Sequence, residues 1–191
     1  AFSGVAFSYN DFRWSDRIKK EDGLIRLVPG LGTRAVDRLS DDYPVLVVPG
    51  QPQLRVNVAI EEIVRYSPKK IDVINLKKRI FETIDIRHLF NESGKDYPAI
   101  HEIVSSLTDY FIQEPGKLSM NFEKNHYIVT FDGLINMTDF AKQIHAILNV
   151  LEKEYGCPVD IEFAHDGDNL YLLQCRPQSQ NIGGLPATIP Y

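Results

Sequence analysis

Four polar residues in the stretch CPVDIEFAHDGDNLYLLQCRP, residues 157–177, have types and spacing that suit phosphate chemistry. They form two pairs with one residue between the members of each pair: Asp160 with Glu162, and Gln174 with Arg176. The neighbouring residues are apolar and typical of buried β-strands. Because side chains alternate between the faces of a strand, the members of each pair share a face. The pattern predicts two strands that each carry polar groups on the face away from the core.

The sequence Gly-Asp-Asn between these strands, residues 167–169, predicts a hairpin turn with Asn169 in the left-handed conformation. A register slipped by one residue would place the acids beside apolar side chains, so the pattern itself favours one register. With a three-residue loop, the expected cross-strand pairs are Asp166–Leu170, Phe163–Leu173, Ile161–Cys175, Glu162–Gln174 and Asp160–Arg176.

The expected register suggests a chemistry for the polar face. Glu162 and Gln174 present oxygen ligands of the kind that Mg²⁺ takes together with substrate phosphates. Arg176, two residues further along, presents a planar guanidinium that binds phosphate well. Two metal ligands and a phosphate clamp are what a nucleoside triphosphate needs. The alternative is a solvent-exposed hairpin face with an Asp160–Arg176 pair that contributes a few tenths of a kcal/mol, and the spacing alone leaves both interpretations open.

Composition bounds the class of protein. The chain has 191 residues, of which 43% are hydrophobic and 25% charged, which is typical of a globular protein with one sizeable core. Its formal charge of −5 is spread along the chain, so we expect neither a nucleic acid nor a membrane surface as partner. No apolar run reaches the length of a membrane span.

Two further features concern the origin of the chain. Cys157 and Cys175 are the two cysteines, too few for a disulfide scaffold, which favours a reducing compartment and a cytoplasmic location. The chain opens without Met on a sequence that already resembles a strand, so we expect it to be part of a longer protein.

Patterns of apolar residues predict a mixed α+β fold, mostly antiparallel sheet with packed helices. The clearest element is a helix over 138–155, with Thr138 as N-cap and Gly156 as the C′ glycine. One apolar stripe runs along it: Phe140, Ile144, Ile147, Leu148 and Leu151. The other expected strands are 2–8, 23–30, 44–50, 71–76 and 125–133, and the other expected helices are 32–39, 57–66, 84–92 and 98–107.

The turn Gly30-Leu31-Gly32 precedes the expected helix 32–39. Backbone N–H groups at such a joint can bind an anion, which makes Gly30 and Gly32 candidate nucleotide contacts. The alternative is that a strand–turn–helix joint needs glycine for its geometry alone. Arg34 and Arg38 follow in the helix, where they face either phosphate or solvent, and we expect solvent.

The segment YGCPVDIEFAHDGDNLYLLQCRP, residues 155–177, resembles the end of the ATP-grasp nucleotide domain of phosphoenolpyruvate synthases and pyruvate phosphate dikinases. That family has a Tyr-Gly-x-Pro-x-Asp-Ile-Glu run followed by Leu-Tyr-x-Leu-Gln-x-Arg-Pro. SGVAFSYN and PGLGTRAVDR, near the N-terminus, are similar to the family's first strand and its Gly-Leu-Gly turn. The likeness covers roughly 2–48 and 125–178, with 57–124 as a poorly matched insert. After the turn, the family usually continues with Val-x-Gly where this chain has Val36-Asp37-Arg38.

The resemblance implies that residues 1–178 are the C-terminal lobe of an ATP-grasp domain and that 179–191 are a linker. It makes Glu162 and Gln174 the Mg²⁺ ligands, Arg176 the catalytic phosphate contact, and Asp160 a support for the same face. The implied activity passes phosphate from Mg-ATP to a histidine on another domain and then to pyruvate. The implied partners are the phosphohistidine and pyruvate-binding domains of the same full-length protein. Since the other ATP-grasp lobe and the phosphohistidine segment have no counterpart here, we expect this chain alone to be inactive.

Two alternatives stay open. Related dikinases with the same nucleotide domain phosphorylate a glucan or a small-molecule drug, so the final acceptor is open. The chain is alternatively a nucleotide-binding or structural module that has lost phosphate transfer. The intact Glu162, Gln174 and Arg176 argue against that loss.

Overall fold

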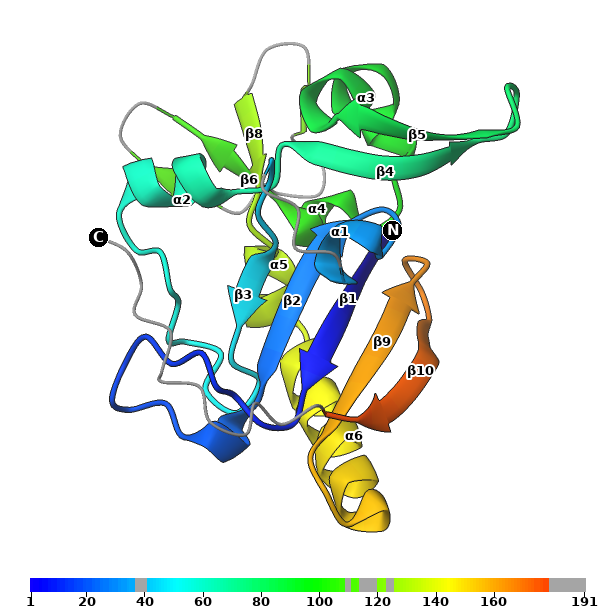
Figure 1. Cartoon of the computed structure of the whole chain (residues 1–191). Coiled ribbons are helices and arrows are strands. Elements are labelled where there is room, and N and C mark those ends of the chain that lie inside the picture. Colours follow the sequence, from blue (N-terminus) through cyan, green and yellow to red (C-terminus); the bar gives the residue numbers. More distant parts are fainter. Residues whose placement is uncertain (37–40, 109–110, 114–119, 123–125, 179–191) are drawn as a thin grey trace.

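The computed structural model describes residues 1–36, 41–108, 111–113, 120–122 and 126–178. Its largest unit is a five-stranded antiparallel sheet with the strand order β10-β9-β1-β2-β3, so the first strand of the chain pairs with one of the last two (Figure 1). The strands of this sheet are β1 (Phe2–Phe7), β2 (Leu24–Pro29), β3 (Val45–Val47), β9 (Val159–His165) and β10 (Leu170–Pro177).

Helix α6 (Phe140–Tyr155) covers one face of this sheet, and the short helix α1 (Thr33–Val36) lies on the opposite face (Figure 1). The predicted apolar stripe of α6 is confirmed. Phe140, Ile144 and Leu148 are buried, and Ile147 and Leu151 pack partly buried against the same core. That core includes Ile161 and Phe163 of β9 and Phe2 and Ala6 of β1.

The segment between β3 and α6 forms two smaller sheets. One is the hairpin of β4 (Lys70–Asn75) and β5 (Ile80–Asp85), which projects from the end of the large sheet (Figure 1). The other has the order β7-β6-β8 and contains β6 (Val104–Leu107), β7 (Ile112–Gln113) and β8 (His126–Val129). The remaining helices are α2 (Ile60–Tyr66), α3 (Ile86–Ser93), α4 (Ile100–Ile103) and α5 (Asp132–Met137), with 3-10 turns η1 (Lys20–Asp22) and η2 (Gly94–Asp96).

These elements confirm the predicted α+β class and most of the predicted strands and helices. Gly156 ends α6 in the left-handed conformation as expected, and the Thr138 hydroxyl accepts a hydrogen bond from the Phe140 N–H, although Asp139 is the formal N-cap. Residues 179–191, the predicted linker, and Arg38 lie outside the described residues.

The middle of the chain departs from the prediction. Strands β5 and β7 and helix α5 were not expected, and the expected helix 98–107 turns into strand β6 after Ile103. The Asp-Gly at 132–133 begins helix α5 instead of closing a strand, because Phe131 takes a left-handed conformation (φ 57°) and redirects the chain there. Propensity alone does not reveal such a reversal, since a bulky residue with positive φ is held there by its surroundings.

The turn of the β9–β10 hairpin also differs from the prediction. Gly167, not Asn169, has the positive φ (118°), and His165 pairs with Leu170 across a four-residue loop. The Asp166 carboxylate accepts hydrogen bonds from the N–H groups of Asp168 (2.9 Å) and Asn169 (2.8 Å). These bonds close a larger loop than the predicted one.

A β-bulge between Leu172 and Gln174 corrects the resulting shift. Phe163 therefore lies opposite Leu172 rather than Leu173, whereas Ile161–Cys175, Glu162–Gln174 and Asp160–Arg176 pair as predicted. Leu173, the predicted partner of Phe163, does not pack in the core, since 64% of its surface is exposed. Among the described residues, no helix is both long and apolar enough to cross a membrane.

Candidate functional site

The polar face lies on the side of the large sheet opposite to α6. One cross-strand row carries Gln174 of β10, Glu162 of β9, Val5 of β1 and Arg26 of β2. Residues that pair directly in a sheet project from the same face. Because Ile161 and Phe163 point into the core under α6, Glu162 and Gln174 share the face that α6 leaves uncovered.

The two expected metal ligands differ in exposure. Glu162 is half-buried and Gln174 is exposed at the edge strand β10. No hydrogen bond joins either side chain to another part of the chain that the structure describes. Their oxygens are therefore unused by the surrounding fold, which fits a role toward a ligand.

Asp160 and Arg176 form an ion pair next to these ligands. The Arg176 Nε donates to the Asp160 Oδ1 at 2.7 Å. The Asp160 side chain is buried, with 8% exposed, while 51% of the Arg176 side chain is exposed. This bond uses the Nε of the guanidinium and leaves the two Nη nitrogens out of the contact with Asp160. The role that the resemblance implied for Asp160, a support for this face, stays a prediction.

The donor set fits a magnesium ion that takes most of its ligands from elsewhere. Mg²⁺ usually keeps several waters and binds to one or two protein oxygens plus substrate phosphates. Glu162 and Gln174 supply two such oxygens on one face. Within the described ranges, no group of three or more His, Cys, Asp or Glu side chains could hold a metal by itself. Glu162 and Gln174 therefore fit a metal ion that arrives bound to a triphosphate better than one held by protein ligands alone.

Helix α1 borders the same face. Its Ala35 packs on Val5 and Val28, and Val5 stands in the row of Glu162. The turn before this helix, Gly30-Leu31-Gly32, therefore lies beside the polar face, as a nucleotide-contacting turn would.

The backbone groups of this turn are largely used inside the chain. The Gly30 N–H donates to the Ala1 carbonyl (3.0 Å), and the Leu31 N–H donates to the Asp72 carbonyl (3.0 Å). Gly30 has φ 73°, and a Cβ there would lie 2.6 Å from the Asp72 carbonyl oxygen. The close approach of strand β4 thus explains why position 30 is glycine. A contact of Gly30 or Gly32 with nucleotide stays a prediction.

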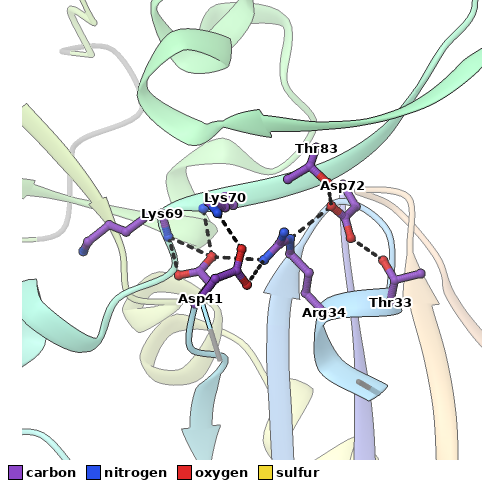
Figure 2. A network of polar contacts seen from close by, with 8 residues as sticks. Thr33, Arg34, Asp41, Lys69, Lys70, Asp72 and Thr83 are labelled. Carbon is purple, nitrogen blue, oxygen red and sulfur yellow. Dashed lines mark hydrogen bonds and ion pairs between the residues drawn. The ribbon is translucent and has the colours of Figure 1, made fainter. Parts of the chain in front are cut away.

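Arg34 is buried, contrary to the prediction that it faces solvent. Only 8% of its side chain is exposed, because it lies against three aspartates. Its Nε is 3.0 Å from the Asp72 Oδ1, and its Nη1 is 3.3 Å from Asp41 and 3.9 Å from Asp42 (Figure 2). Burial alone would lower the pKa of Arg34, but the bonds to Asp72 and Asp41 outweigh it and raise the pKa.

Asp72 is the centre of this network. Its carboxylate also accepts hydrogen bonds from the hydroxyls of Thr33 (2.5 Å) and Thr83 (2.7 Å) (Figure 2). Burial would raise the pKa of Asp72, but these two bonds and the one from Arg34 outweigh it and lower the pKa. Sequence analysis missed Asp72 because it lies about 40 residues from Arg34 along the chain. A buried-strand pattern interrupted by Asp in KIDVIN was the only available signal.

One cavity lies elsewhere in the molecule. It has a volume of about 360 Å³ and lies between β3, α2 and α5, where Arg55 donates to Asp132 (2.8 Å) and to the Thr130 carbonyl. None of the four polar residues of the hairpin lines it. The polar face is itself partly open to solvent, since Gln174 is exposed and Glu162 is half-buried.

Comparison with known proteins identifies the family of this chain. The family model described as "Pyruvate phosphate dikinase, AMP/ATP-binding domain" matches residues 1–185, including the segment 57–124. A phosphoenolpyruvate synthase of Pseudomonas aeruginosa (strain UCBPP-PA14) is 47% identical over 45 residues. That match covers 22% of this chain and spans 5% of the relative's length. Since the family model covers nearly the whole chain, this protein belongs to the pyruvate phosphate dikinase AMP/ATP-binding domain family.

Proposed function

We propose that this chain is the ATP-binding part of a phosphoenolpyruvate-synthase-like phosphotransferase. In this proposal, phosphate passes from Mg-ATP to a histidine on another domain of the full-length protein, and then to pyruvate. The observation that carries it is the direct pairing of Glu162 with Gln174 on the face that also bears Arg176. The family supports ATP as the ligand and an ATP-dependent phosphotransferase of the kinase type as the class.

Each residue of the face has a role in this proposal. Glu162 and Gln174 hold the metal that accompanies the triphosphate, and the metal neutralises charge on the phosphate oxygens. Arg176 donates from its outer nitrogens to a phosphate oxygen, which stabilises the charge that develops during transfer. Asp160 keeps the guanidinium turned toward that oxygen through the bond to Nε. The charge of Arg176 is thus placed before the substrate binds, which limits the reorganisation needed during the reaction.

The open polar face suits a site that a second body completes. An exposed carboxamide and a half-exposed guanidinium cannot exclude water from a phosphate by themselves. Phosphate transfer needs water to be kept away from the reacting group. We therefore infer that another lobe of the full-length protein covers this face, and that this chain alone binds Mg-ATP weakly and consumes none.

The proposal is tested with the full-length protein. Incubation with Mg-ATP and pyruvate, followed by ³¹P NMR, should show phosphoenolpyruvate and the loss of ATP. Phosphate transfer to a glucan or a small-molecule drug instead of pyruvate would keep the nucleotide chemistry and change the acceptor. Mg-ATP binding without any loss of ATP would favour a binding module. No affinity for Mg-ATP in calorimetry would contradict the proposal at its first step.

A further inference from the structure

Three contacts join the Gly30-Leu31-Gly32 turn and α1 to a single residue of the β4–β5 hairpin. The main-chain carbonyl of Asp72 accepts a hydrogen bond from the Leu31 N–H (3.0 Å). In the Asp72 side chain, Oδ2 accepts one from the Thr33 hydroxyl (2.5 Å), and Oδ1 accepts one from the Arg34 Nε (3.0 Å). The Asp72 side chain is buried, with 4% exposed. One residue therefore holds the turn through both its main chain and its side chain.

The hairpin in turn holds Asp72. Thr83 of β5, directly opposite Asp72, donates its hydroxyl to the same carboxylate (2.7 Å). At Gly30 the two backbones approach so closely that a Cβ would meet the Asp72 carbonyl oxygen at 2.6 Å. The hairpin and the turn therefore cannot shift independently without leaving a buried carboxylate or guanidinium short of partners, which is costly.

The turn matters because α1 lies on the proposed nucleotide face. Ala35 of α1 packs on Val5, and Val5 pairs with Glu162. A displacement of α1 thus acts on the surface beside the proposed metal ligands. Through the bonds of Asp72 to Thr33 and Arg34, which Figure 2 shows, the segment 57–124 is linked to α1 and so to the surface beside the site.

We propose that Asp72 is a positioning residue, through which the β4–β5 hairpin sets the place of the Gly30-Leu31-Gly32 turn and α1 on the nucleotide face. This inference rests on the proposed function, since it assumes that Mg-ATP binds on that face. It assigns Asp72 no contact with nucleotide. Its effect passes through Leu31, Thr33 and Arg34.

The chain offers a matched control in Asp42. This aspartate is also buried and also bonded to strand β4, since its carboxylate accepts from the N–H groups of Lys69 (2.9 Å) and Lys70 (2.8 Å). It reaches Arg34 only at 3.9 Å and makes none of the three contacts that hold the turn. Asp42→Asn therefore perturbs a carboxylate of the same network without altering the side-chain acceptor of Thr33 and of the Arg34 Nε.

The experiment compares Asp72→Asn with Asp42→Asn in the full-length protein. Calorimetry with Mg-ATP, well below the melting temperature of both variants, should show a dissociation constant raised by about tenfold in Asp72→Asn and by less than about twofold in Asp42→Asn. Amide hydrogen exchange at Leu31 and Ala35, followed by mass spectrometry, should accelerate in Asp72→Asn alone.

A second pair of variants keeps the test independent of folding defects. Thr33→Val removes one hydroxyl bond to Asp72 with little change in volume, and Thr33→Ser restores it. We expect weaker Mg-ATP binding in Thr33→Val and recovery in Thr33→Ser, which loss of packing alone would not produce. If wild type binds Mg-ATP but Asp72→Asn and Thr33→Val bind it equally well, the positioning inference is wrong and the proposed function stands. If wild type itself has no affinity, the proposed function fails, and this inference fails with it.

Discussion

Glu162 lies directly opposite Gln174 across the β9–β10 ladder, although the neighbouring pairs on the turn side are shifted by one residue. The bulge at Leu173 restores the alignment just before Gln174. Bulges commonly redirect side chains next to functional sites. Here the bulge brings a carboxylate and a carboxamide together on one face, which is the relationship that the proposed metal role requires.

The first prediction concerns these two ligands. In the full-length protein, Glu162→Ala and Gln174→Ala should each reduce phosphate transfer by about 10²-fold or more, because electrostatic clamps on phosphate contribute several kcal/mol to the barrier. A higher Mg²⁺ concentration should partly restore both variants. The measurement is the initial rate of ATP consumption across a Mg²⁺ titration.

Asp168→Ala is the matched control for this experiment. It removes an exposed carboxylate from the turn of the same hairpin, away from the polar face. Its rate should equal that of wild type at every Mg²⁺ concentration. A similar loss in Asp168→Ala and Glu162→Ala would mean that the overall charge of the hairpin matters, not a metal ligand.

The second prediction separates the role of Arg176 in transfer from its role in folding. Arg176→Ala should abolish most phosphate transfer without rescue by Mg²⁺. It should also lower the free energy of unfolding by about 1–3 kcal/mol, because the buried Asp160 loses its charged hydrogen-bond donor.

The double variant Asp160→Asn with Arg176→Ala provides the discriminating measurement. Removing the charge of Asp160 should recover part of the lost stability in urea denaturation, since no buried carboxylate is left unpaired. Transfer should stay as low as in Arg176→Ala. Recovery of transfer along with stability would show that Arg176 acts only through folding.

Local sequence patterns predicted the parts of the fold that local physics determines. Strict alternation in VDIEF and the 3-to-4 spacing in α6 reveal which face is buried, because both repeats follow from backbone geometry. They predicted the α6–sheet core and the pairing of Glu162 with Gln174. They could not predict the bulge, because a turn closed by the Asp166 carboxylate depends on side-chain bonds that alternation does not encode.

Contacts between segments that are distant in the sequence could not be predicted from local patterns. Arg34 was expected in solvent because a helix that begins at a turn usually has an exposed face. Its burial depends on Asp72 of a strand that arrives much later in the chain. A charged residue becomes buried only where partners are supplied, and the pattern around Arg34 does not show them. Strand β5 and helix α5 were missed for other reasons. Most residues of β5 are exposed and, among the residues that the structure describes, it pairs with β4 alone, so no buried stripe marks it, and α5 begins after the left-handed Phe131.

The third prediction tests the core beneath the site. Leu148 on α6 is buried, with 1% exposed, and packs in the cluster that contains Ile161 and Phe163. Leu148→Ala should lower the free energy of unfolding by about 2–5 kcal/mol, through lost burial and a residual cavity. Val150→Ala on the same helix, where the side chain is 62% exposed, should change it by less than about 1 kcal/mol. Equal denaturation midpoints for the two variants would place α6 away from the sheet.

The last prediction uses the titration of Asp72. The pKa of Asp72 is lower in the folded chain than the ordinary value, since hydrogen bonds from Thr33, Thr83 and Arg34 outweigh the effect of burial. A group whose pKa falls on folding stabilises the folded state above its unfolded pKa of about 3.9, and that contribution is lost as the pH falls through the folded value. Acidification from about pH 5 to pH 2 should therefore lower the free energy of unfolding of wild type more steeply than that of Asp72→Asn.

The charged groups around Asp72 define the controls for this measurement. Arg34 faces it directly, and Asp41, Asp42 and Lys70 complete the same network, with Lys70 paired to Asp41 (Figure 2). Asp41 is exposed, so Asp41→Asn should leave most of the acid dependence in place. Chemical denaturation at matched pH values gives the slope for each variant. The slope compared is that of the free energy of unfolding against pH. If this slope is the same in Asp72→Asn and wild type but flatter in Asp41→Asn, the acid-sensitive group is the exposed Asp41–Lys70 pair and not the buried Asp72.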